Sequence, residues 1–310
     1  MQYHYYLYGM RVTADLDFVQ LDPVRLPEDD RDFGREKVRI RAMDEEEEAQ
    51  FRKEHGDCVC GSFLGTEKGW LCNRTLAMSV ERGQVIRYHI RKGGDPGAVR
   101  TYLLGFGIAM LSLQQGKLPI HCSALATPEG GAILIAGESG AGKSTLTAEL
   151  LKRGYRFLAD DMAVVDISGK EGVWVYPAFP YMKLCRDVVL RQGYPPEELL
   201  YIDEKKDKFL VPCTGVFQRE KARRWKKEAE DKSGKIKAEK IIGPDSMIVY
   251  KDNLFLRHLW KKQDPGMEIW QNCLKIAEQI PVFWIRRPAA GDSTAEVAAE
   301  VHALRNVVSA

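Results

Sequence analysis

The sequence has 310 residues, 45% of them hydrophobic, and a formal net charge of +2 at pH 7. A chain of this size can bury a sizeable core and is expected to form two domains. The nearly balanced charge argues against a nucleic-acid binder, and no apolar run approaches the ~20 residues of a transmembrane helix. The N-terminus also lacks the basic region and cleavage site of a signal peptide. We therefore expect a cytoplasmic protein, with no nucleic acid and no membrane among its partners.

The first part of the chain, residues 1–117, predicts a small N-terminal α+β domain. Strand-like patterns are found in three segments: 1–20 (around Gly9), 69–76 and 84–90. The turn-forming residues 93–97 precede a helix predicted over 98–115, which Gly116 ends. The acidic run 44–48 predicts a solvated loop or helix face.

The seven cysteines are an odd number and are mostly isolated along the chain. Cys58, Cys60 and Cys72 form the only cluster, and His55 adds a candidate fourth zinc ligand. No C-x₂-C pair accompanies this cluster, so reduced and partly buried thiols are the favoured interpretation. A zinc site is the alternative.

A strand is predicted over 118–126, followed by a turn cluster at 127–131 and a buried strand over 132–136. If the two strands form a hairpin, counting back from the turn places His121 opposite Gly137. The imidazole would then lie near the groups that follow the second strand. There it could tune a base, bind a phosphate oxygen or approach a metal ion. A purely structural histidine is the alternative.

The segment after the second strand has the spacing of a phosphate-binding P-loop. Its residues are Gly137, Glu138, Ser139, Gly140, Ala141, Gly142, Lys143 and Ser144, followed by Thr145. Glycines let backbone N–H groups point at phosphate oxygens, and the N-terminus of the helix predicted over 144–153 adds a favourable potential. Lys143 is expected to reach the β- and γ-phosphates of a nucleoside triphosphate, and Ser144 to place its hydroxyl on Mg²⁺. A glycine-rich turn before an ordinary helix is the alternative.

Two adjacent carboxylates, Asp160 and Asp161, end a short strand that begins at residue 155. The helix before this strand runs about 15 Å away from the loop, and the strand runs roughly 16 Å back. In a right-handed βαβ unit, the two acids therefore return to the level of the phosphates. One carboxylate could hold Mg²⁺ and the other could accept a proton from an attacking hydroxyl. Alternatively, Asp161 starts a turn and Asp160 alone is a metal ligand.

His121, the loop 137–144 and the run 153–161 together resemble the core of the bacterial HPr serine kinase/phosphorylase family. The resemblance implies an α/β fold: a P-loop domain of the HPr-kinase and phosphoenolpyruvate-carboxykinase type, with a mixed sheet. It implies that Asp160 is the general base toward a substrate serine, with Asp161 and His121 assisting it. It also implies that the loop binds ATP and Mg²⁺, so Ser144 and Asp161 are the expected metal ligands.

The resemblance is close over 118–165 and looser over 176–212. HPr-specific members carry a glycine-rich stretch of the form E-x-R-G-L-G-I, where this chain has residues 175–184 instead. A glutamate ligand for Mg²⁺ has no counterpart there. The chain is more similar to a related branch found with peptide-biosynthesis operons. Lasso-peptide tailoring kinases of that branch phosphorylate a serine at the C-terminus of the precursor.

Lys205, Lys206 and Lys208 precede the apolar run 209–212. A cation aimed at the transferring phosphoryl group would stabilise its developing charge. HPr kinases have a Lys-Arg pair before an apolar strand, and Lys208 is the nearest match to that pair. A solvated charged turn is the alternative.

The C-terminal third contains an unusually charged segment, 218–240. The favoured interpretation is an exposed helix and loop insertion, and the alternative is a basic flap that binds an acidic or extended peptide. The elements predicted after it are a strand at 247–250, helical structure from 254, a buried strand at 281–285 with Arg286 and Arg287 at its exit, and a helix at 295–308 capped by Ser293 or Thr294.

Together these patterns predict a P-loop kinase domain over 118–310. The favoured function is that of an ATP- and Mg²⁺-dependent serine kinase acting on a peptide or small protein, with a lasso-peptide precursor as substrate. An HPr serine kinase/phosphorylase is the first alternative. A nucleotide-binding regulatory module without kinase activity, or a transferase for a small-molecule hydroxyl, represents a different class. HPr kinases are hexamers, so the resemblance also leaves a homo-oligomer open.

Overall fold

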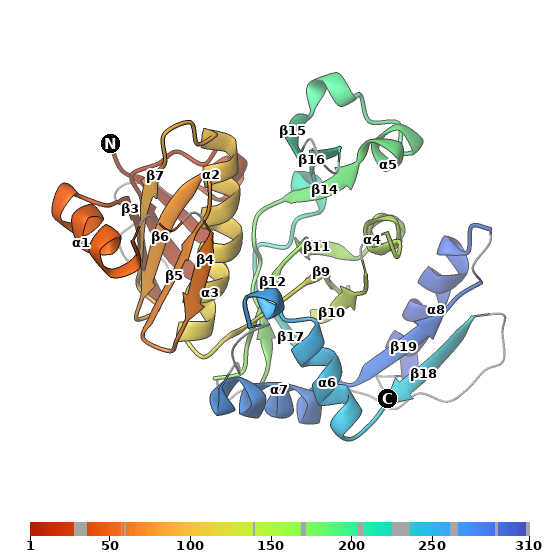
Figure 1. Cartoon of the computed structure of the whole chain (residues 1–310). Coiled ribbons are helices and arrows are strands. Elements are labelled where there is room, and N and C mark those ends of the chain that lie inside the picture. The colour runs from red at the N-terminus through yellow and green to blue at the C-terminus, as the bar shows by residue number, and fades with distance from the viewer. Residues whose placement is uncertain are drawn as a thin grey trace. The chain divides into compact units, whose positions relative to one another are not determined.

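The computed structural model describes residues 1–27, 36–56, 58, 60–138, 140–168, 172–203, 207–224, 236–260, 266–288 and 291–307. The chain divides into two compact units (Figure 1). Unit 1 consists of Met1–Pro119 and Phe255–Asp264, and unit 2 of Ile120–Leu254 and Pro265–Ala310. The sequence predicts domains at 1–117 and 118–310. The units differ from these limits because the later segment Phe255–Asp264 belongs to unit 1.

Unit 1 is built on a seven-stranded sheet with the order β1-β2-β3-β7-β6-β5-β4. Its strands are β1 (Tyr3–Leu7), β2 (Met10–Ala14), β3 (Glu36–Ala42), β4 (Gly61–Leu64), β5 (Lys68–Cys72), β6 (Leu76–Glu81) and β7 (Val85–Ile90). The sheet is mixed, because β3 is parallel to both β2 and β7 while the other neighbours are antiparallel. The strands predicted around Gly9 are confirmed as β1 and β2.

One helical run covers a face of this sheet (Figure 1). It comprises α2 (Pro96–Tyr102), a π-helical turn η2 (Leu103–Gly107) and α3 (Ile108–Gln114). A Cβ on Gly107 would lie 3.1 Å from Cδ1 of Ile86, so glycine permits the close approach of helix and sheet. Pro96–Gln114 is the one described helix long and apolar enough to cross a membrane, and half of its apolar window is buried in the protein. The helix includes Arg100 and is not an unbroken apolar run, and the core helix of a globular protein has the same length and composition.

The remaining helices of unit 1 are α1 (Glu45–His55) and the short 3₁₀ helices η1 (Val19–Val24) and η5 (Arg257–Trp260). The predicted acidic run is the start of α1. Asp44 accepts a hydrogen bond from the N–H of Glu47, and the Glu47 side chain accepts one in return from the N–H of Asp44. This reciprocal capping box, with further acidic residues in the first turn, explains why the helix begins there.

Unit 2 contains a second mixed sheet, with the order β11-β9-β10-β17-β13-β12-β8. Its strands are β8 (Leu118–Ile120), β9 (Cys122–Ala126), β10 (Gly131–Ala136), β11 (Arg156–Ala159), β12 (Ala163–Asp166), β13 (Trp174–Val175) and β17 (Ala222–Arg224). β9 is antiparallel to both β10 and β11, whereas β10 is parallel to β17. The α/β class and the mixed sheet predicted from the sequence are thus present.

Two smaller sheets complete unit 2. The first pairs β14 (Tyr181–Cys185) and β15 (Leu200–Asp203) with β16 (Lys208–Pro212), and the second pairs β18 (Lys237–Ile241) with β19 (Val282–Arg286). The helices are α4 (Lys143–Lys152), α5 (Arg186–Arg191), α6 (Pro244–Asp252), α7 (Met267–Gln279) and α8 (Thr294–Val307), with 3₁₀ turns η3 (Pro196–Glu198) and η4 (Thr214–Val216). Helix α4 packs against β9, β10, β14 and α8.

Several sequence predictions need correction. The strand expected over 118–126 is interrupted at His121, and its two parts occupy different positions in the sheet order. The strand expected over 247–250 is part of helix α6. β19 is a strand as predicted, but half-buried to exposed rather than buried, because it pairs only with β18. The described ends of the charged segment 218–240 are strands β17 and β18, and residues 225–235 lie outside the described part of the chain.

Candidate active site

β10 and β11 both pair with β9 and run in the same direction. The loop after β10 and the two acids after β11 therefore lie at the same end of these strands. Cys122 pairs with Ala136 at the last step of the β9–β10 register, and His121 and Gly137 are the next residue of the chain on either side of this pair. On the other side of β9, Ala159 at the end of β11 pairs with Ala124. Neighbouring strands lie about 4.8 Å apart. The residues that follow β10 and β11 therefore lie at the N-terminal end of β9, one group on each side of that strand.

The loop between β10 and α4 has the backbone conformation that its glycines permit. Gly137, Gly140 and Gly142 have φ angles of 153°, 83° and 89°, values that residues with a Cβ rarely adopt. Gly142 is the N-cap of α4. The Lys143 ammonium lies across the loop, where Nζ donates to the carbonyl oxygens of Gly137 at 2.7 Å and Glu138 at 3.0 Å. An amino group thus sits at the point where the N–H groups of the α4 N-terminus are exposed, an arrangement that favours anions.

Asp160 is held by two hydrogen bonds. Its Oδ1 accepts from the Ser123 hydroxyl at 2.6 Å, and its Oδ2 accepts from the backbone N–H of Lys183 at 2.8 Å. Ser123 comes from β9 and Lys183 from β14. Because each carboxylate oxygen has two lone pairs, both oxygens keep acceptor capacity. The carboxylate is therefore fixed in position and can still accept a proton.

Asp161 adopts a left-handed backbone conformation, with φ of 66°. Its Oδ2 lies 2.7 Å from Nζ of Lys183, and its Oδ1 lies 3.7 Å from Nδ1 of His121. Burial raises the pKa of this carboxyl, but the charge and hydrogen bond of Lys183, with further help from His121 and Lys208, hold the pKa at about 2. Asp161 is therefore a carboxylate at neutral pH.

The His121 ring is oriented by the backbone of the acid pair. Its Nδ1 lies 2.8 Å from the carbonyl oxygen of Asp161. A carbonyl can only accept, so Nδ1 carries a proton in this contact. The backbone of His121 is also fixed, because its N–H donates to the carbonyl of Asn253 at 2.7 Å.

The site carries more positive than negative charge. Burial lowers the pKa of Lys143, while Asp160 and Asp161 oppose that shift and the ammonium of Lys208 adds to it. Lys208 also acts on Asp161. Together with Lys183, three ammonium groups thus surround two carboxylates. Such an excess of positive charge suits a ligand with several negative charges, as a polyphosphate has.

An arginine from the C-terminal part of the chain also contacts the loop. Nη2 of Arg287 lies 3.4 Å from the carbonyl oxygen of Ala141, and 3.5 Å from the place of a Cβ on Gly142. Arg287 follows β19 directly and is exposed. Its guanidinium can reach an anion bound at the loop.

The structure therefore gathers most of the predicted site residues. His121, Lys143, Asp160, Asp161 and Lys208 interact with one another through hydrogen bonds, ion pairs or their charges, and Ser144 and Thr145 follow Lys143 in the first turn of α4. Ser139, Lys205 and Lys206 lie outside the described residues. Ser123, Lys183 and Arg287 were not predicted as site residues. Of these three, the sequence drew attention only to Arg287, as one of two arginines that follow a predicted strand.

The cysteine cluster does not form a metal site. Among the described residues, no group of three or more His, Cys, Asp and Glu side chains is arranged to hold a metal ion. Cys72 donates its thiol hydrogen to the carbonyl oxygen of Cys58 at 3.2 Å. Burial, with the neighbouring Cys58, raises the pKa of Cys72 to about 12.

Comparison with known proteins places a match on this region. Residues 119–177 match the family described as HPr Serine kinase C-terminal domain. The chain is also 47% identical over 49 residues to the HPr kinase/phosphorylases of Streptococcus salivarius and of Streptococcus pyogenes serotype M1. Each match covers 16% of this chain and 16% of the relative. The similarity thus includes the loop and the acid pair and spans only a small part of either protein.

Proposed function

We propose that this protein is a serine kinase that transfers the γ-phosphoryl group of ATP, with Mg²⁺, to a peptide or small protein. The observation that carries the proposal is the position of Asp160 and Asp161, which emerge at the same sheet edge as the glycine loop. The similarity of residues 119–177 to an HPr serine kinase domain supports the same chemistry. Soluble ATP as the phosphoryl donor is also in keeping with a cytoplasmic protein.

In this proposal, residues 137–145 bind the triphosphate. The N–H groups of the loop and of the first turn of α4 contact phosphate oxygens, and Lys143 turns from the loop carbonyls toward the β- and γ-phosphates. Arg287 lies close enough to the loop to neutralise further phosphate charge.

Mg²⁺ would be held by the hydroxyl of Ser144 and the carboxylate of Asp161. Hydroxyl and carboxylate oxygens are the hard donors that this ion prefers, and the low pKa of Asp161 keeps it ionised, so the residues present fit the ion. When bound, the ion would neutralise charge on the phosphates. Because Asp161 is paired with Lys183 by an ion pair of 2.7 Å, the lysine would have to share the carboxylate with the metal.

Asp160 is the proposed general base. It accepts the proton of the substrate serine as the serine oxygen forms a bond to the γ-phosphorus, and the bond from that phosphorus to the β–γ bridging oxygen breaks to release ADP. The bonds from Ser123 and Lys183 orient the carboxylate for this step. His121, beside Asp161, would tune the charge of the pair, and Lys208 would stabilise charge on the transferred group.

Two substrates are compatible with this chemistry. We favour the C-terminal serine of a lasso-peptide precursor, because residues 175–184 lack the glycine-rich stretch of HPr-specific members. Incubation of the protein with Mg²⁺-ATP and either a serine-ended precursor peptide or HPr, followed by mass spectrometry, tests both. A phosphate increment on the peptide supports the favoured substrate, and an increment on HPr alone rejects it.

A regulatory module that binds nucleotide without transferring phosphate is the competing function. It would bind ATP and modify neither substrate in the same assay. The intact acid pair argues against it, because a switch needs only a metal-binding carboxylate.

A further inference from the structure

The sheet of unit 1 has one face covered by the helical run 96–114 and an opposite face that is rich in basic residues. Side chains alternate along a strand, so Val38 and Ile40 of β3 point to the helix side and are buried, whereas Lys37, Arg39 and Arg41 point the other way. Arg87 of β7 lies beside Arg41 in the register, and Arg11 of β2 lies beside Lys37.

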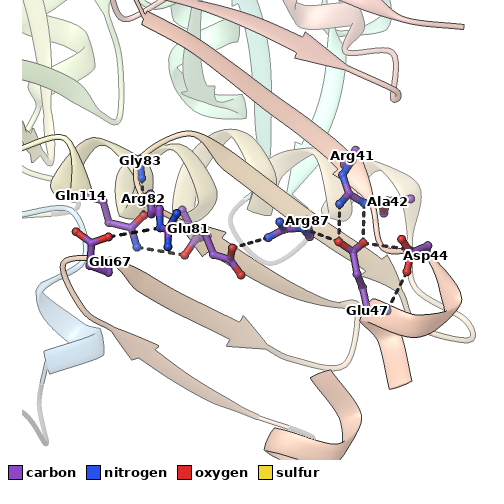
Figure 2. A network of polar contacts seen from close by, with 11 residues as sticks. Arg41, Ala42, Asp44, Glu47, Glu67, Glu81, Arg82, Gly83, Arg87 and Gln114 are labelled. Atoms are coloured by element: carbon purple, nitrogen blue, oxygen red, sulfur yellow. Dashed lines mark hydrogen bonds and ion pairs between the residues drawn. The ribbon is translucent and has the colours of Figure 1, made fainter. Parts of the chain in front are cut away.

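At one end of this basic face, the arginines are neutralised (Figure 2). Glu47 of α1 accepts from Nη1 of Arg41 at 2.6 Å and lies 2.8 Å from Nε of Arg87. Glu81 lies 2.9 Å from Nη1 of Arg87. Hydrogen bonds from Arg41, opposed by partial burial and helped by the charge of Arg87, lower the pKa of Glu47 to about 2. This half of the face needs no further anion.

At the other end, the basic residues lack such partners. Arg11, Lys37 and Arg39 form no ion pair with any residue in the described part of the chain. Arg11 and Lys37 are direct neighbours on adjacent strands, where like charges are destabilising. The positive charges of Arg11, Lys37 and Arg39 therefore repel one another, and no carboxylate of the described residues neutralises them by an ion pair.

Arg11 is the most unusual of them, because it is only 6% exposed. Its Nη1 is buried and has no hydrogen-bond partner among the residues that the structure describes. A buried guanidinium nitrogen without an acceptor is costly. A bound anion that accepts a hydrogen bond from this nitrogen would remove that cost.

Arg11 also lines a pocket of ≈ 650 Å³ on this face, a size that accommodates a small metabolite. The polar lining includes His4, Arg11, Thr13, Lys37, Arg39 and Gln84, with no carboxylate among the described lining residues. His4 and Thr13 are joined by a contact of 3.0 Å between Nδ1 and Oγ1.

We propose that this pocket binds the phosphate group of a small phosphorylated molecule. Guanidinium and ammonium groups pair well with phosphate oxygens, and Thr13 and Gln84 add neutral donors.

The test uses the full chain and inorganic pyrophosphate at constant ionic strength, in a buffer free of phosphate. The NMR signal of the His4 ring, assigned by its loss in His4→Gln, is the readout, because His4 lines this pocket. A saturable shift of this signal is expected. The double variant Lys37→Gln/Arg39→Gln should weaken binding at least about tenfold, because it removes two charge-assisted contacts.

The matched control is Lys68→Gln/Arg74→Gln, which removes the same charge from exposed positions of unit 1 and should change the affinity by less than about twofold. Three results would overturn the proposal. The first is no saturation by about 10 mM pyrophosphate. The second is an equal loss in the control, which would indicate diffuse attraction. The third is an unchanged affinity in Lys37→Gln/Arg39→Gln, which would indicate that these side chains do not hold the phosphate.

Discussion

At the scale of single residues, Lys183 connects the two acids of the candidate site. Its backbone N–H binds Asp160 and its ammonium binds Asp161. The residue belongs to the segment 175–184, where the resemblance to HPr kinases is lost, so no motif pointed to it. Its role depends on β14 lying next to the acid pair, which only the tertiary structure reveals.

Replacement of Asp160 by Asn tests the proposed base. The amide keeps the shape and can still accept one hydrogen bond, but it cannot take the serine proton. We expect the turnover number to fall about 10²–10⁴-fold while the dissociation constant for ATP changes by less than about threefold. Asp187→Asn, at an exposed helix position, is the control and should keep full activity. Near-normal turnover of the Asp160 variant would remove Asp160 from its role.

Replacement of Lys183 by Met tests the origin of the low pKa of Asp161. Its pKa is about 2 in the folded protein against an ordinary 3.8, so the group stabilises the fold above pH 3.8 and loses that contribution as the pH falls toward 2. The shift corresponds to roughly 2 kcal/mol. Without Lys183, burial is offset only by the weaker effects of His121 and Lys208, so the folded pKa of Asp161 should rise toward the ordinary value.

Urea unfolding at pH 5 and at pH 2.5 measures the effect. The wild-type protein should lose more of its free energy of unfolding between these two pH values than the Lys183→Met variant does. Lys68→Met, which removes an exposed lysine of unit 1, should behave as the wild type. An unchanged pH dependence in Lys183→Met would mean that Lys183 does not control Asp161.

At the scale of elements, the loop before α4 depends on the unusual backbone of its glycines. Substitution of Gly142 (φ 89°) by Ala places a Cβ in the left-handed region, at a cost of about 1–2 kcal/mol. We expect this variant to bind ATP about tenfold more weakly, because the strain moves the N–H groups that would contact phosphate. Isothermal titration calorimetry measures the affinity.

Gly116→Ala is the matched control for this prediction. Gly116 also has a left-handed conformation, with φ of 73° and no atom near its missing Cβ, but it ends α3 in unit 1. It should lose a similar free energy of unfolding and keep its ATP affinity. Equal affinities for both variants and the wild type would argue against a phosphate-binding role for the loop.

The sequence predicted those elements whose signals are local. β1, β2, β10 and α4 follow from alternation, turn residues and a helix stop, and the predicted hairpin is present as β9 and β10. Residues 247–250 were misassigned because their apolar, β-branched character favours a strand, whereas Gly243 and Pro244 begin a helix. The break at His121 arises from pairing with Asn253, more than one hundred residues away, which no local pattern contains.

At the scale of the whole molecule, unit 1 is made from two separate stretches of chain. Phe255 packs in it against Phe106, with ring centroids 5.8 Å apart, and Leu256 is fully buried. The site residues also come from separate parts of the chain: Ser123 lies in β9, Lys143 in α4, the two acids directly after β11, Lys183 in β14 and Lys208 in β16. Spacing grouped the loop with the two acids and the family resemblance added Lys208, whereas nothing in the sequence pointed to Lys183.

Removal of residues 1–117 tests this arrangement. The remaining chain, 118–310, keeps Phe255 without the aromatic partner it has in unit 1. We expect this fragment to bind a hydrophobic dye and to aggregate. Ser at positions 255 and 256 should reduce both effects, with dye fluorescence and light scattering as readouts. A fragment that is monomeric and does not bind dye without these changes would show that Phe255–Asp264 does not need unit 1.

The divided make-up of unit 1 has a consequence for synthesis of the protein. A ribosome that adds about 5–20 residues per second needs on the order of 10–30 s to go from residue 119 to residue 264. During that interval, the surface around Phe106 that receives Phe255 stays uncovered on the nascent chain. Unit 1 is therefore not complete until residue 264 has been translated, although most of it precedes residue 120. Chaperones have most opportunity to bind it before that point.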